Sequence, residues 1–84
     1  MRWEDLRANY PNTWVLIEAL EAHSKEGKRI LDSLSIVETF EEGDEALNAY
    51  RKFHKKDPQR ELYVVHTKKP NLEILERKWL GVRI

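Results

Sequence analysis

The chain has 84 residues, 40% of them hydrophobic and 36% charged, and its 15 Lys and Arg balance its 15 Asp and Glu. A chain of this length forms one small domain that buries only about 60–65% of the surface of its unfolded form, which leaves no room for a deep active site. The zero net charge gives no overall attraction to nucleic acid or anionic lipid, and the absence of cysteine excludes disulfides, thiolate chemistry and zinc knuckles.

The first ten residues predict a short helix that ends before Pro11. Trp3, Leu6 and Tyr10 stand at positions i, i+3 and i+7, which lie on one face of a helix. Proline restricts the residue before it to extended conformations, so the helix stops at this point. A helix this short is not stable alone and must pack onto the rest of the domain.

The segment 13–23 fits two structures. Its EALEA stretch is rich in strong helix formers, and Thr13 is a suitable helix cap. Its WVLI stretch is aromatic and β-branched, and alternate residues of the segment share one strand face. The neighbouring residues favour the strand, because Gly27 suits the loop of a hairpin and residues 29–38 form a second alternating segment. We therefore expect a hairpin of 14–23 with 29–38, and a helix over 13–23 is the alternative.

The hydrophobic period changes near residue 40 from that of a strand to that of a helix. Thr39 and Glu42 have the spacing of a capping box, in which each side chain accepts a hydrogen bond from a backbone amide at the start of a helix. The helix is expected from Glu42 or Asp44 to Lys55, with acidic residues at its start and basic residues at its end, as the helix dipole favours. Its expected buried residues are Ala46, Leu47, Tyr50 and Phe53.

The rest of the chain predicts strands. Residues 61–67, ELYVVHT, are dense in aromatic and β-branched residues, and 72–76 and 79–84 resemble one or two further short strands. We expect residues 1–84 to form a single α+β domain. It would contain a short N-terminal helix, a β-hairpin, a central helix and C-terminal strands, in a small antiparallel sheet with its helices mainly on one face.

Two of these motifs support a resemblance. The YPNTWVLI stretch at 10–17 and the TFEE stretch at 39–42 resemble small bacterial and archaeal domains of unknown function. Those domains open with a Tyr-Pro-x-x-Trp-Val strand and carry a Thr-x-Glu-Glu helix start. The closing ERKWLGVR also resembles the tails of short hypothetical proteins of Gram-positive bacteria. The resemblance implies a strand at 14–17, and it assigns no catalytic residue.

The candidate catalytic and metal-binding groups are better explained as structural. His23, His54 and His66 fall on three different elements, without the spacing that sets two metal ligands on one face. The acidic cluster 41–45 is accounted for by the helix dipole. No serine stands in a Gly-x-Ser-x-Gly or Ser-x-x-Lys motif, and the glycines are isolated. We therefore predict no catalytic residue, no metal, no cofactor and no enzyme activity.

The basic residues are a first candidate for a binding site. Ten of the 15 Lys and Arg lie in the second half of the chain, together with several aromatic residues. A nucleic-acid-associated accessory protein or antitoxin-like regulator is therefore the second hypothesis for function. Its candidate contacts are Lys55, Lys56, Lys68 and Lys69.

The tryptophans are a second candidate. Trp3, Trp14 and Trp79 are many for a core of this size, and tryptophan is enriched at protein interfaces. The chain also shows neither the apolar run of a signal peptide nor a stretch of membrane-spanning length, and it lacks the disulfides usual in small secreted proteins. Our first hypothesis is therefore a cytoplasmic, non-enzymatic bacterial protein that contacts a protein partner or forms a homodimer.

Overall fold

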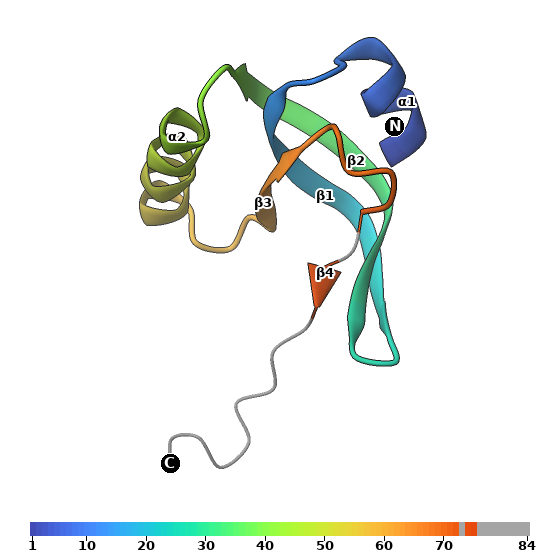
Figure 1. Ribbon diagram of the computed structural model, residues 1–84. Helices are drawn as coiled ribbons and strands as arrows, with labels where there is room; N and C mark the ends of the chain where they lie inside the picture. The colour runs from blue at the N-terminus through green and yellow to red at the C-terminus, as the bar shows by residue number, and fades with distance from the viewer. Residues whose placement is uncertain (73, 76–84) are drawn as a thin grey trace.

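The structure, a computed structural model, describes residues 1–72, 74 and 75. Figure 1 shows the elements of this part of the chain in order: α1 (Trp3–Asn9), β1 (Trp14–Lys25), β2 (Lys28–Phe40), α2 (Gly43–Lys56), β3 (Leu62–His66) and β4 (Ile74–Leu75). The strands form one sheet in the order β3-β1-β2-β4, and each neighbouring pair is antiparallel. The α+β class and the antiparallel sheet are therefore confirmed.

The hairpin is confirmed and is longer than predicted. β1 pairs with β2 from Trp14 opposite Phe40 to Lys25 opposite Lys28, so a helix over 13–23 is excluded. The turn consists of Glu26 and Gly27, whose φ angles are +52° and +79°. Positive φ at both central residues gives the turn a twist that matches that of the strands, and glycine adopts this conformation without steric cost.

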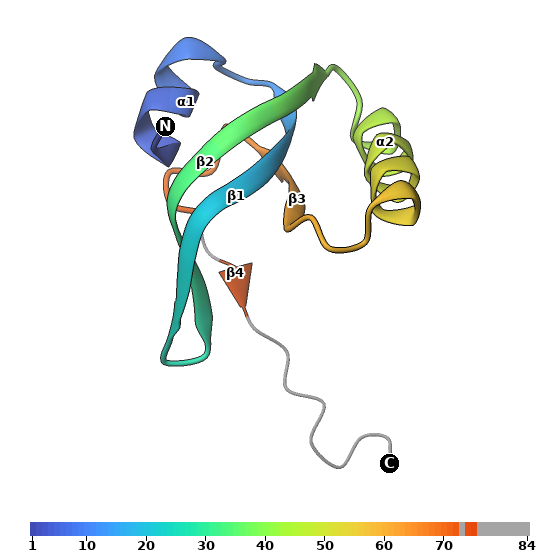
Figure 2. The same cartoon turned by 180° about the vertical axis from the view of Figure 1, so that it is seen from behind.

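Irregularities in the hairpin make it coil. The register between β1 and β2 shifts at Leu16/Ile17, at Ala19/Glu21 and at Glu21/Ala22. Bulges of this kind bend the strand and increase its twist. Figure 2 shows the result, a hairpin whose far end turns away from the body of the sheet.

The two helices cover opposite faces of the sheet instead of gathering mainly on one. Trp3 and Leu6 of α1 pack with Val15, Ile17 and Leu34 in one cluster of buried residues. α2 lies on the face of Trp14 and Leu16, because a Cβ added at Gly43 would stand 3.2 Å from the Trp14 ring. The consecutive residues 15–17 are fully buried as a consequence, since both faces of β1 are covered.

The start of α2 differs from the prediction. Thr39 is not part of a capping box; it lies within β2, opposite Val15. α2 begins at Gly43 after Glu42, which makes no side-chain capping hydrogen bond. The capping box was wrong because β1 offers backbone partners as far as Phe40, and strand pairing extends over the threonine. The dipole pattern is present, with acidic residues in the first turn and basic residues in the last.

The ends of the chain agree in part with the predictions. Trp3 and Leu6 are buried as expected, but Tyr10 follows the end of α1 and is 39% exposed. β3 falls within the predicted strand 61–67, and β4 within the predicted strand 72–76. The predicted strand 79–84 lies outside the described residues.

Candidate interaction surface

The structure separates the tryptophans that were candidate interface residues. Trp3 is 8% exposed, and its indole Nε1 donates a hydrogen bond of 3.0 Å to the carbonyl of Lys69. This bond ties α1 to the segment after β3, so most of the Trp3 side chain serves the core. Trp79 lies outside the described residues.

Trp14 is half-buried on the opposite face from Trp3. Its ring stands under Gly43 at the start of α2 and meets the His66 ring edge-on, with centroids 5.0 Å apart. It therefore joins the start of α2 to the end of β3. Trp3 and Trp14 do not form a common surface.

The four candidate lysines form two separate pairs. Lys55 and Lys56 are exposed in the last turn of α2, and Lys68 and Lys69 are exposed just after β3. α2 runs antiparallel to β3, since its start lies beside Trp14 and His66. The two pairs therefore lie near opposite ends of β3 (Figure 1).

An ion pair holds the entrance to β3 against β1. Arg60 donates hydrogen bonds of 3.2 and 2.7 Å from Nε and Nη2 to the two carboxylate oxygens of Glu18, and its guanidinium lies 5.4 Å from the centre of the Phe53 ring. The hydrogen bonds from Arg60 hold the pKa of the Glu18 carboxyl below its usual value. This cluster joins β1, α2 and the segment before β3.

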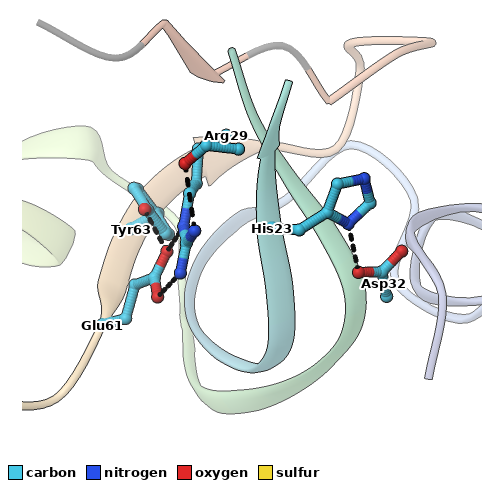
Figure 3. A network of polar contacts seen from close by, with 6 residues as sticks. His23, Arg29, Asp32, Glu61 and Tyr63 are labelled. Carbon is cyan, nitrogen blue, oxygen red and sulfur yellow. Dashed lines mark hydrogen bonds and ion pairs between the residues drawn. The ribbon is translucent and has the colours of Figure 1, made fainter. Parts of the chain in front are cut away.

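A second network joins the start of β2 to the start of β3. Figure 3 shows Arg29, Glu61 and Tyr63 pointing toward one another. Arg29 donates from Nε to Glu61 Oε2 at 2.7 Å and from Nη2 to Oε1 at 2.9 Å, and the Tyr63 hydroxyl donates to Oε2 at 2.6 Å. The bonds from Arg29 lower the pKa of the Glu61 carboxyl, while burial and the bond to Glu61 raise the pKa of the Tyr63 hydroxyl.

These contacts give the partly buried carboxylates a structural role. Arg29 and Glu61 are only 28% and 29% exposed, and the two groups neutralise each other in place. His23 and Asp32 form a third pair, 2.7 Å apart, on the exposed far part of the hairpin (Figure 3). Among the residues that the structure describes, no group of three or more His, Cys, Asp or Glu is placed to hold a metal ion.

The outer backbone edge of β3 is the feature that sequence analysis missed. Ala19 N–H donates to the Glu61 carbonyl, and Thr67 N–H donates to the Thr13 carbonyl, each at 2.9 Å. Residues 61, 63, 65 and 67 therefore direct their backbone groups toward β1, because antiparallel strands alternate in this way. Leu62, Val64 and His66 direct theirs outward, and the His66 carbonyl on that side accepts a hydrogen bond of 3.2 Å from Lys69 N–H. Within residues 1–72, 74 and 75, no strand pairs with this edge.

The other edge of the sheet is partly covered. β4 pairs with β2 at Lys28 and Arg29, and Leu34 N–H donates to the Met1 carbonyl at 2.9 Å. β3 also lacks the usual protections of an edge strand, since its five residues, LYVVH, include neither a charged Lys or Glu nor a proline. β3 therefore offers the more open backbone edge in the described part of the chain.

A shallow apolar groove runs beside this edge. Leu47 and Tyr50 of α2 form one wall, and Leu62, Tyr63 and Val64 of β3 form the other. We call these five residues, together with the outer edge of β3, the β3–α2 groove. Leu47 was expected to be buried but is 44% exposed, because the core face of α2 centres on Ala46, which is 0% exposed. The feature of the sequence that could have indicated the groove is the lack of Lys, Glu and proline in β3.

Comparison with known proteins gives no relative: no protein-family model, no curated protein and no solved structure matches the chain. None of the helices in the described residues is long and apolar enough to cross a membrane.

Proposed function

We propose that this chain is a small cytoplasmic bacterial protein, without enzyme activity, that acts through protein contacts at the β3–α2 groove. The observation that carries the proposal is the outward-facing backbone of Leu62 and Val64 beside the exposed side chain of Leu47. Such an edge accepts an added strand, whose main-chain hydrogen bonds supply affinity.

The groove supplies the second part of a strand-binding site. A strand added beside β3 would place alternate side chains against Leu47 and Tyr50 on the α2 side of the sheet. Burial of this apolar surface contributes about 25 cal/mol per Å². Backbone pairing alone is weak in water, so an apolar wall next to an open edge is what distinguishes a binding site from an ordinary edge strand.

The partly buried charges support the non-enzymatic part of the proposal. Glu18 and Glu61 each accept two hydrogen bonds from an arginine, and the bonded arginines lower the pKa of both carboxyls. A general acid at neutral pH needs a raised pKa, so these two groups are suited to holding the fold together.

Leu47→Lys tests the proposal. A lysine at this exposed position keeps helix propensity but puts a charge into the groove, and we expect association to be lost. Leu20→Lys is the matched control, because Leu20 is 58% exposed on the hairpin and does not line the groove. Sedimentation velocity over a concentration series, and binding of each variant to partners captured by the wild type, are the measurements. Equal association by both variants would contradict the proposed site, provided that circular dichroism shows both to be folded.

A further inference from the structure

The proposed function leaves the partner unnamed, and the inference here rests on it. We infer that the strand added to β3 is β3 of a second copy of this chain, paired antiparallel with Val64 on the twofold axis. The result would be one continuous sheet across two protomers. Three properties of the groove lead to this partner: its hydrogen-bond register, its lack of charge and the position of α2.

The register follows from the alternation along β3. The outward-facing residues are Leu62, Val64 and His66, and Val64 is their midpoint. A twofold axis at Val64 sets Val64 opposite its own copy and Leu62 opposite His66 of the other protomer. The two Val64 residues then exchange two bonds, and the His66 N–H of each copy donates to the Leu62 carbonyl of the other, about four bonds in total, because the His66 carbonyl already accepts from Lys69 N–H at 3.2 Å. An axis at Tyr63 or Val65 would leave His66 or Leu62 unpaired.

The charges also permit a second copy. The chain carries 15 basic and 15 acidic residues, so two copies do not repel each other as wholes. Within Leu62–His66 the opposed pairs are apolar or join leucine to histidine, so no like charges meet along the added strand. A self-complementary surface of this kind is what a twofold interface requires.

The position of α2 also favours a second copy. A twofold axis perpendicular to the sheet keeps both copies of α2 on the same face. The Leu47 and Tyr50 side chains of one protomer then face those of the other across the axis. One symmetric contact would thus cover both exposed parts of the groove, the backbone edge of β3 and the 44% exposed side chain of Leu47.

The absence of native cysteine makes the register directly testable. Opposed residues in a hydrogen-bonded pair have Cα atoms about 5.5 Å apart, which is within the usual range of a disulfide. Val64→Cys should therefore form a covalent dimer under mild oxidation, seen as a doubling of mass on a non-reducing gel. Leu62→Cys alone should form no covalent dimer on this gel, while an equimolar mixture of Leu62→Cys and His66→Cys should cross-link. Thermal unfolding of the reduced variants checks that each is folded.

The outcomes separate this inference from the proposed function. Cross-linking of Leu62→Cys to the same extent as Val64→Cys would indicate random collision and would overturn the register. A folded Val64→Cys that does not cross-link, with a wild type that still binds partners and loses them with Leu47→Lys, would overturn the second copy while the proposed site stands. A monomeric wild type whose partner binding is unchanged by Leu47→Lys would overturn both the second copy and the proposed site.

Discussion

Glu61→Gln should destabilise the domain, because Glu61 is the shared acceptor for Arg29 and Tyr63. The carboxylate receives two hydrogen bonds from Arg29, of 2.7 and 2.9 Å, and one of 2.6 Å from Tyr63. Glutamine has nearly the same shape, but its NH₂ group is a hydrogen-bond donor. It would therefore face another donor group, of Arg29 or Tyr63, where the carboxylate oxygen now accepts. The charged hydrogen bonds between Arg29 and residue 61 would then be lost at a site where Arg29 is only 28% exposed.

The size of the effect follows from the exposure of the pair. Hydrogen bonds to charged groups contribute about 1.5–3 kcal/mol, and partial exposure to solvent reduces this. We expect a loss of about 1–2 kcal/mol in the free energy of unfolding at pH 7. For a domain of this size, such a loss lowers the melting temperature by about 4–15 °C. Glu21→Gln is the matched control, since Glu21 is exposed on β1, and it should change stability by less than about 0.5 kcal/mol.

The pH dependence provides a second measurement. The pKa of Glu61 is lower in the folded protein than its ordinary value of 4.5. On acidification the unfolded chain therefore binds the proton first, so the stability from Glu61 is complete above this value and is lost as the pH falls below it. Urea unfolding between pH 7 and pH 3 should show the difference between wild type and Glu61→Gln shrinking toward acid. A difference that is absent at pH 7, or constant down to pH 3, would refute the role of the network.

Two further predictions concern the core and the second hypothesis for function. Leu16→Ala should lower the free energy of unfolding in urea by about 2–5 kcal/mol, because the Leu16 side chain of β1 is 0% exposed. Leu47→Ala, at a 44% exposed position, should lower it far less. Similar losses for the two variants would mean that α2 is packed differently. The wild type should not retain DNA or RNA at low salt, as measured by filter binding. Retention that falls steeply with salt would instead support the nucleic-acid hypothesis, if it were abolished by glutamate at Lys55, Lys56, Lys68 and Lys69.

The features that sequence alone determined are those set by neighbouring residues. The alternation in 14–23 and the glycine at 27 were enough to predict the hairpin, because a two-residue turn and two apolar faces are local properties. The period of 44–55 likewise predicted α2, and the aromatic and β-branched residues of 61–67 predicted β3. Each of these elements is present within a few residues of its expected position.

The sequence-based predictions were wrong where a contact with a distant part of the chain overrides the local pattern. Thr39 has the spacing of a helix cap, but the backbone of Val15 is available to it as a strand partner. Leu47 belongs to the apolar stripe of α2, yet the helix meets the sheet through Ala46. In both cases a distant part of the chain decides, and its position is not contained in the local pattern.

The candidate site was decided by tertiary structure alone. Arg29 and Glu61 are far apart in the sequence, and only the folded sheet brings them within hydrogen-bonding distance. The open edge of β3 depends on strand order, which places β1 in the centre and leaves β3 at the side. Hydrophobic patterning specifies which face of a strand is buried, but not which of its two backbone edges finds a partner, since every residue offers the same N–H and C=O groups.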